Sequence, residues 1–319
     1  MLNRKTLTIS AAVLALSAAA SQAEEFVRVG GGLTGTYPLF AAKLSELIND
    51  NIEGVRAAVV PSDSEQAQAM LQLGELDLNI AYTWLVKKIA DGDGAYGVPA
   101  PDARHIITLY GSALHMVAVP GTITSLYELD DKPLRVWTGP ESQFFYQIVE
   151  PVVQAHGFEM SDIAKAGGVT ETMDYGGEIQ AFQDGRLDVG FFSGGIPYGL
   201  LQQIERSPGF TMLGLDEAAL AKLQEIVPGM GSINIPAGTY ANQDAEVVAP
   251  YYVNQLVASV NTDEELVYQV TKIMYEQYEA FHGLFPGAEQ IDDQDPMAFN
   301  AVPLHPGAER FYREVGVID

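Results

Sequence analysis

The chain has 319 residues, of which 17 are basic and 42 are acidic, and its formal net charge is −25. It contains no cysteine, which excludes a disulfide framework, a lipid-modified cysteine anchor and a cysteine nucleophile. The acidic excess opposes binding to nucleic acid or to an anionic membrane surface, because like charges repel. The length is sufficient for one large domain or for two lobes.

The first residues have the pattern of a secretory signal peptide. Arg4 and Lys5 precede an apolar run over 7–20, and small residues lead up to Ala23. The run is shorter than the ~20 residues that a membrane-spanning helix needs. We therefore expect cleavage after Ala23 and export of a soluble chain that starts at Glu24. That chain would have 15 basic residues (17 minus Arg4 and Lys5) and 42 acidic ones, a charge of −27.

Strand and helix patterns alternate through the first part of the chain. Short apolar runs predict strands at 26–30, 55–60, 76–81, 106–110 and 115–119. Apolar residues at helical spacing predict helices at 37–50, 65–73 and 82–90. Ser62 and Glu65 form a capping-box pattern that would start the second helix. Pro120-Gly121 is a turn at which the chain could enter a second lobe.

The alternation continues further along the chain. We expect strands at 134–138 and 188–192, and helices at 143–156, 177–184 and 197–206. A polar connection over 236–250 leads to a strand at 251–260. Ser125 with Glu128 and Thr262 with Glu265 are further capping patterns, and the latter pair would start a long helix. A last helix would start at Pro306. This order predicts an α/β architecture with a largely parallel sheet.

The chain contains an internal repeat. Arg28 lies in a short apolar run that enters a glycine-containing turn and a helix, and Asp77 follows 49 residues later. Arg135 starts a similar sequence that reaches Asp188 after 53 residues. Two related α/β units predict two lobes with a cleft between them. We expect residues 24–119 with 251–319 to form lobe 1, residues 120–250 to form lobe 2, and 1–23 to be the signal peptide.

Gly30-x-Gly32-x-x-Gly35 matches the fingerprint of dinucleotide-binding proteins, because it follows a strand and opens a helix. Asp63 lies just past the next strand, where a ribose-binding carboxylate could lie. Export and the different glycine spacing of the second turn, over 139–143, argue against a nucleotide. The property shared by both turns is a helix N-terminus that can bind an anion. We therefore expect no cofactor.

Catalytic patterns are sparse. The sequence has no HExxH zinc helix and no GxSxG nucleophile elbow. His105 and His115 fall in or beside predicted strands and are interpreted as hydrogen-bonded structural residues. We expect no catalytic residue and no resident metal, although Asp63 leaves open a metal ion that bridges ligand and protein.

Five sequence blocks resemble a known family in their order along the chain. They are VGGGLTGTYPL (29–39), LGELDL (73–78), FFSGGIP (191–197), IPAGTY (235–240) and PLHPGAERFY (303–312). The chain looks like a TAXI-type solute receptor of the tripartite ATP-independent periplasmic (TRAP) transporters. The resemblance implies a two-lobed type II periplasmic-binding-protein fold with a ligand cleft between the lobes. It also implies a periplasmic monomer that captures a small organic acid or amino acid, such as glutamate, for the membrane permease subunits.

The sequence departs from the family pattern at two predicted cleft segments. Family members often have a Gln-Ser-Asp type segment where this chain has Tyr82-Thr83-Trp84. The usual Ser-Gly-Thr step is replaced by Ser142-Gln143-Phe144. The added aromatic rings have two interpretations, which are packing between the lobes and contact with an apolar or planar part of the ligand. Specificity for a glutamate-type ligand is therefore open.

Arg28 and Arg135 fall at strand starts, whereas ligands bind beyond the carboxyl ends of such strands. We therefore expect helix dipoles and neutral donors to bind the ligand's negative charge. Helix capping by Thr34 and Thr36, and core packing of Tyr37, are the alternative roles. An exported enzyme or a signalling receptor on the same fold are the alternative functions. The predicted ligand-binding residues are Thr34, Gly35, Thr36, Tyr37, Asp63, Thr83, Trp84, Ser142, Gln143, Phe144, Ser193 and Gly194.

Overall fold

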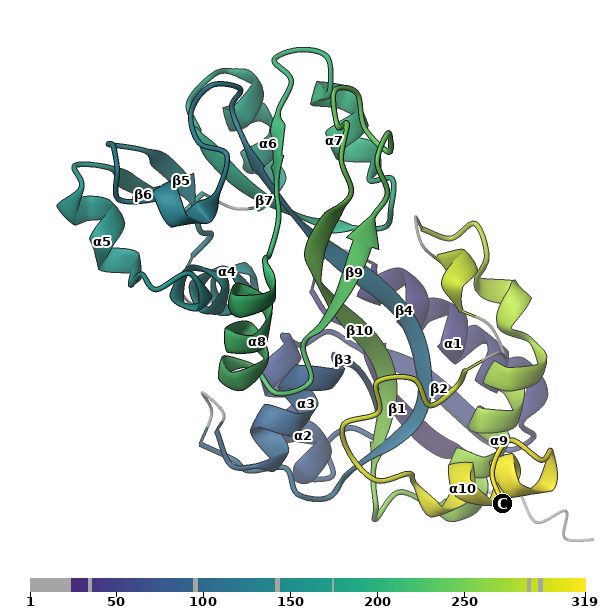
Figure 1. Cartoon of the computed structure of the whole chain (residues 1–319). Coiled ribbons are helices and arrows are strands. Elements are labelled where there is room, and N and C mark those ends of the chain that lie inside the picture. The colour runs from purple at the N-terminus through teal and green to yellow at the C-terminus, as the bar shows by residue number, and fades with distance from the viewer. Residues whose placement is uncertain are drawn as a thin grey trace, which may run out of the picture.

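A computed structural model describes residues 24–33, 36–93, 97–140, 144–173, 175–285, 288–291 and 295–319 (Figure 1). Its strands belong to one sheet. They are β1 (Glu25–Gly30), β2 (Val55–Val60), β3 (Leu78–Tyr82), β4 (Ala103–Ala118), β5 (Arg135–Trp137), β6 (Val169–Glu171), β7 (Val189–Gly194), β8 (Thr211–Leu213), β9 (Gly231–Ile235) and β10 (Val247–Ser259). The helices are α1 (Tyr37–Asn51), α2 (Ser64–Gln72), α3 (Thr83–Ala90), α4 (Phe144–Ala155), α5 (Met160–Lys165), α6 (Tyr175–Gln183), α7 (Gly199–Ile204), α8 (Glu217–Ile226), α9 (Glu264–Glu276) and α10 (Pro306–Glu314), with short 3₁₀ turns η1 (Leu126–Glu128), η2 (Tyr278–Phe281) and η3 (Ala288–Gln290).

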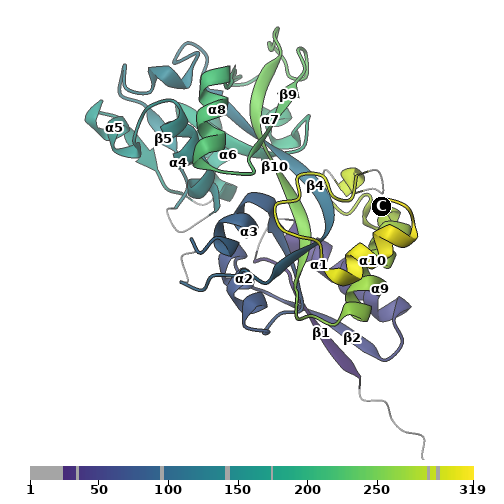
Figure 2. The ribbon, with the colours of Figure 1, turned by 60° about the horizontal axis from the view of Figure 1, so that its bottom comes forward.

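The strand order is symmetric about its centre. It runs β2-β1-β3-β10-β4-β7-β5-β6, so the parallel set β2-β1-β3 on one side corresponds to the parallel set β6-β5-β7 on the other. The two sets form two halves of the molecule, which β4 and β10 join (Figures 1 and 2). The internal repeat of the sequence is therefore visible as a repeat of the strand pairing.

β4 and β10 pass through both halves. Residues 103–113 of β4 pair with β10, and residues 113–118 pair with β7. The prediction of separate strands at 106–110 and 115–119 is wrong, because one strand of 16 residues spans both. Gly111 stays extended within this strand under the ring of Tyr251, whose hydroxyl lies 1.6 Å from the place of a Cβ. The division into 24–119 with 251–319 and 120–250 stays a prediction.

The second half contains short elements that the sequence did not predict. They are α5, β6, β8, α8 and β9. The predicted connection over 236–250 is too long, because β10 already begins at Val247 and pairs with β9. Among the residues that the structure describes, none of the helices combines the length and apolar character that crossing a bilayer requires.

The repeat is fixed by two matching ion-paired clamps. In the first half the Arg28 backbone N–H and Nε donate to Asp77 Oδ2 at 2.7 and 2.9 Å, and Nη2 donates to Oδ1 at 2.8 Å. In the second half the Arg135 groups contact Asp188 in the same way, at 2.8, 2.9 and 2.6 Å. The first clamp joins the middle of β1 to the residue before β3. The second joins the first residue of β5 to the residue before β7. The arginines are therefore structural.

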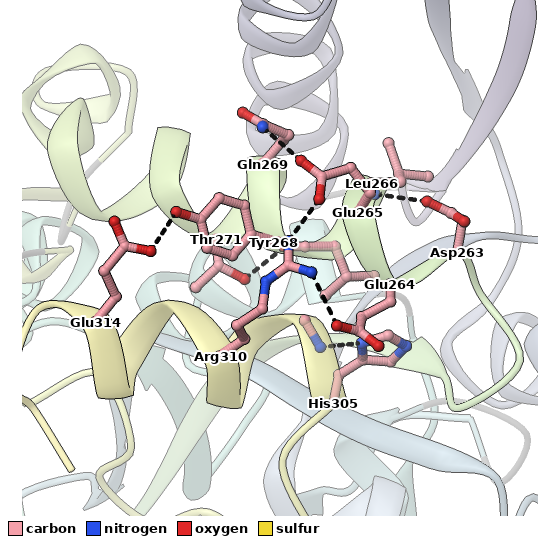
Figure 3. A network of polar contacts seen from close by, with 12 residues as sticks. Asp263, Glu264, Glu265, Leu266, Tyr268, Gln269, Thr271, His305, Arg310 and Glu314 are labelled. Atoms are coloured by element: carbon pink, nitrogen blue, oxygen red, sulfur yellow. Dashed lines mark hydrogen bonds and ion pairs between the residues drawn. The ribbon is translucent and has the colours of Figure 1, made fainter. Parts of the chain in front are cut away.

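The C-terminal block PLHPGAERFY docks α10 on α9. Arg310 donates to Glu264 at 2.9 Å and to Glu265 at 2.5 Å, and its guanidinium lies 4.2 Å from the ring centre of Tyr268 (Figure 3). A Cβ at Gly307 would lie 2.3 Å from the carbonyl oxygen of Glu264, so only glycine allows this close approach of the two helices. The block therefore completes the core of the first half.

Two of the three predicted capping boxes are displaced by one residue. Asp63, and not Ser62, caps α2 by accepting from the Gln66 N–H at 2.8 Å. Asp263, and not Thr262, caps α9. The box of Ser125 and Glu128 is confirmed at η1.

Candidate functional site

The carboxyl end of β1 leads into α1, whose first residues contact both long strands. The hydroxyl groups of Thr36 and Tyr110 are hydrogen-bonded. Tyr37 donates its hydroxyl to Asn254 Oδ1 at 2.7 Å, and Asn254 Nδ2 donates to the Tyr110 carbonyl at 2.8 Å. Thr36 is the N-cap residue, but its side chain makes no capping hydrogen bond. The helix N-terminus is thus fixed to the place where β4 and β10 pass from one half to the other.

Four tyrosines meet at this place, and we refer to Tyr37, Tyr82, Tyr110 and Tyr252 as the tyrosine cluster. The ring of Tyr82 lies 5.5 Å from that of Tyr37 and 5.1 Å from that of Tyr252, measured between centroids. The Tyr252 hydroxyl is hydrogen-bonded to Ser193 Oγ at the end of β7, which belongs to the other half. The cluster therefore connects predicted site residues from both halves.

The phenols of the tyrosine cluster stay neutral. Burial raises the pKa of Tyr37 and of Tyr82 well above the usual value, and it raises the pKa of Tyr110 and Tyr252 as well. A neutral phenol can both donate and accept a hydrogen bond. Arg28 and Arg135 are tied to Asp77 and Asp188 at the strand starts. Uncharged donors thus surround the junction of the two halves.

Thr83 and Trp84 follow directly after Tyr82, at the start of α3. Both side chains are buried, and the Trp84 ring stacks on Tyr82 with 6.4 Å between centroids. Trp84 also packs against the turn between α8 and β9, since the place of a Cβ at Gly229 lies 3.6 Å from the Trp84 Cα. This contact crosses between the halves and supports the packing interpretation. Contact of Trp84 with a ligand stays a prediction.

The remaining predicted residues have different positions. Asp63 caps α2 at the carboxyl end of β2. Gly194 ends β7 under the Tyr198 ring, which lies 2.2 Å from the place of a Cβ, so a side chain there would displace the ring. Phe144 begins α4. Thr34, Gly35, Ser142 and Gln143 lie outside the described residues.

Sequence reasoning missed Asn254 and Tyr110. Asn254 lies where the pairing of β10 with β4 shifts in register between Val253 and Gln255, and its side chain is 1% exposed. A polar amide in the apolar run Tyr251–Ser259 was the available signal, because a buried amide needs specific hydrogen-bond partners. Tyr110 gave no such signal, since tyrosine is common in strands.

A second network fixes the loop that follows Gly194. The Tyr198 backbone N–H donates to the Tyr240 hydroxyl at 2.7 Å, and that hydroxyl lies 2.8 Å from His115 Nε2. The phenol therefore donates to Nε2, which leaves the imidazole hydrogen on Nδ1 to donate to the Phe192 carbonyl at 3.3 Å. Burial lowers the pKa of His115 to about 4. The interpretation of His115 as a structural residue is confirmed.

The structure also bears on metals and catalysis. Among the described residues no three His, Cys, Asp or Glu side chains are grouped so that they could hold a metal ion. The Asp63 side chain caps a helix by accepting from Gln66 N–H. His105 lies between Gln255 Oε1 at 2.6 Å and the Pro296 carbonyl at 3.0 Å. A role of Asp63 in ligand binding stays a prediction.

A model of the NMT1-like family matches residues 29–316. The chain belongs to the NMT1-like family. Among solved structures, this NMT1-like chain is similar to PhnD1 from Prochlorococcus marinus in complex with methylphosphonate. The identity is 14% and the TM-score 0.50, over 92% of this chain and 100% of that one.

Two further structures have lower TM-scores. The periplasmic aliphatic sulphonate binding protein SsuA from Escherichia coli is 14% identical, with a TM-score of 0.45 over 90% of this chain and 78% of that one. A TRAP periplasmic solute binding protein from Rhodobacter sphaeroides is 15% identical, with a TM-score of 0.43 over 91% and 92%.

Identities this low show only that these proteins share a fold with this chain. The NMT1-like chain has the α/β fold of type II periplasmic binding proteins.

Proposed function

We propose that this protein is a TAXI-type receptor of a TRAP transporter. Export would place residues 24–319 in the periplasm. There the receptor captures a small organic acid or amino acid, glutamate-like or with another carboxylate, and delivers it to the membrane permease subunits. The five sequence blocks and the match to the NMT1-like family over 29–316 support this proposal.

One observation carries the assignment of the site. The N-terminus of α1 and the end of β7, which come from different halves, meet at the tyrosine cluster through Tyr252 and Ser193. A carboxylate placed there would accept from backbone N–H groups at the start of a 15-residue helix and from neutral hydroxyls. The ring of Tyr82, which is only partly buried, offers a surface for the apolar part of a ligand.

A ligand that contacts both halves favours the closed arrangement. The size of this shift equals the difference in its affinity for the closed and open forms. A permease could recognise the closed form by its shape. Delivery of the ligand therefore requires no reaction catalysed by the receptor.

The experiment is a thermal-shift screen of residues 24–319 against carboxylates, amino acids, keto acids and aromatic acids, followed by calorimetry. A ligand at about 100 times its dissociation constant stabilises by about 2.7 kcal/mol. Thr36→Ala and Ser142→Ala should weaken binding of the compound with the largest shift, whereas exposed Thr124→Ala should not. Both variants binding like the parent would refute the site, and turnover of a bound compound would favour an exported enzyme.

A further inference from the structure

The two long strands have a second face, opposite the tyrosine cluster. Successive side chains of a strand point to opposite faces. Tyr252 points to the cluster, so its neighbour Tyr251 points away from it. Tyr251 lies beside a pocket of ≈ 210 Å³, whose other walls include Gly111, Gln290 and Phe299. Gln290 and Phe299 come from the C-terminal part of the chain, which passes over β4 and β10 in Figure 1.

This back face carries contacts that span the two halves. Gln290 Oε1 accepts from the Gly111 N–H at 3.1 Å and from the Tyr251 hydroxyl at 3.3 Å. The Phe299 ring packs edge-on against Tyr251, with 6.0 Å between centroids and 62° between planes. The place of a Cβ at Gly231 lies 3.2 Å from the Phe299 ring. Gly231 begins β9 in the second half, whereas Phe299 follows from the first half.

Phe299 is held in an unfavourable state. Its side chain is 52% exposed, and its φ is 55°, a left-handed conformation that bulky residues avoid. Such a conformation is strained and persists only where surrounding contacts fix it. Core packing cannot account for a ring that is half exposed. The ring itself contacts Tyr251 and Gly231, and the neighbouring Ala298 carbonyl accepts from Thr108 Oγ1 on β4 at 2.7 Å.

The pairing of the two long strands is irregular at two places, of which one is at this level and the other lies between Leu256 and Val257. The pairing of β10 with β4 shifts in register between Val253 and Gln255, beside Gly111 on β4. Bulges bend a strand and raise its local twist. A bend of β4 and β10 here would change the angle between the two halves.

We propose that Phe299 and Gln290 form a hinge brace, which opposes closure of the halves over the tyrosine cluster. Closure on one face of β4 and β10 widens the opposite face, so it would separate Phe299 from Tyr251 and Gly231. Each contact that must be lost makes the closed form less populated and reduces apparent affinity by the same factor. The effect on affinity rests on the proposed function, whereas the effect on shape does not.

The test measures shape without a ligand. Because the chain lacks cysteine, Ala42→Cys on α1 and Ala164→Cys on α5, both exposed, give a spin-label pair with one label in each half. Pulsed electron paramagnetic resonance measures the distribution of distances between the two labels in the parent, in Phe299→Ala and in Gln290→Ala. Phe26→Ala removes an exposed ring on β1 far from the hinge and is the matched control.

We expect Phe299→Ala and Gln290→Ala to move the distribution to shorter distances, with the larger shift for Phe299→Ala. Phe26→Ala should leave it unchanged, and circular dichroism should show native secondary structure in all variants. Distances that are unchanged or longer in Phe299→Ala would overturn the proposal, as would an equal shift in Phe26→Ala. A failed ligand screen would leave this result intact, so the two proposals fail separately.

Discussion

At the scale of single residues, polar side chains in apolar surroundings hold the candidate site in place. The His115 imidazole lies between β4 and the loop after β7, and the Tyr240 phenol links it to the Tyr198 backbone. Tyr240 belongs to the IPAGTY block and Tyr198 follows the FFSGGIP block. Tyr198 and Tyr240 are 42 residues apart in sequence, and the two segments meet at this hydrogen-bonded phenol.

Tyr240→Phe should lower the free energy of unfolding by about 1–3 kcal/mol, because the Tyr198 N–H and His115 Nε2 would lose their shared partner in a buried place. Urea denaturation at pH 7 measures the change. Tyr127→Phe is the matched control, since its phenol is exposed and bonds only weakly to Asp216 at 3.3 Å. It should change stability by less than about 0.5 kcal/mol. Equal effects of both variants would contradict the role of the network.

The same histidine makes stability depend on pH. Burial holds the pKa of His115 at about 4, below the usual 6.5, so the folded state binds fewer protons than the unfolded one. The stabilisation of the folded state by neutral His115 is complete above pH 6.5 and is lost as the pH falls through about 4.

At the scale of elements, the Arg–Asp clamps fix which strands are neighbours. Each aspartate accepts a backbone N–H as well as the guanidinium, so it sets the register of two parallel strands and not only a surface charge pair. The sequence repeat at Arg28 and Arg135 predicted related units but not this geometry, because both arginines could equally have pointed to solvent.

Asp188→Asn should lower the free energy of unfolding at pH 7 by about 1–3 kcal/mol, since hydrogen bonds to charged groups are the strong ones. The Arg135 hydrogen bond lowers the pKa of Asp188 below its usual 3.8. The carboxylate therefore contributes above that pH, and the difference between parent and variant should vanish as the pH falls through the folded pKa. Asp184→Asn, in a long 3.5 Å contact with Arg186, is the control and should be nearly neutral. A difference that persists at acid pH would contradict the clamp.

Sequence periodicity predicted the long elements well and the short ones poorly. The strand at 55–60 is confirmed to the residue, and α1 extends one residue beyond the predicted 37–50. β6 and β8 have three residues each, which are too few for an alternating pattern of apolar and polar residues to be recognised. The capping patterns failed by one residue at α2 and α9 because an aspartate, an equally good cap, follows the serine or threonine.

The candidate site was predictable only in part. Thr36 and Tyr37 follow β1, and Ser193 lies near the end of β7. The carboxyl ends of both strands face the junction, so topology alone pointed to these residues. Asn254 and Tyr110 belong to strands that read as core, and only the pairing of β4 with β10 brings them to α1. Contacts between residues 144 positions apart leave no local pattern in a single sequence.

At the scale of the whole molecule, the two halves share β4 and β10, so neither half has a separate sheet. β4 is 16 residues long and β10 is 13, and each contributes to both halves. Separating the halves would remove pairing partners from β3, β7 and β9 at once. The hydrophobic cores of the halves are thus coupled through shared backbone.

We therefore expect a single cooperative unfolding transition. Scanning calorimetry should give a calorimetric enthalpy equal to the van't Hoff enthalpy, the test of two-state behaviour. Tryptophan fluorescence should change at the same temperature as the far-ultraviolet dichroism, since Trp137 lies in the second half and Trp84 in the first. Two resolved transitions would show that the shared strands do not couple the halves.

The late position of β10 also fixes when the chain can fold. Its residues 247–259 complete the sheet in both halves, and α10 at 306–314 closes the core of the first. Until the ribosome has released nearly the whole chain, neither half has all its strands. A polypeptide that must pass through a narrow translocation channel in an extended form gains from this order of synthesis. For the exported receptor proposed above, the strand order would keep the sheet incomplete until synthesis is nearly finished.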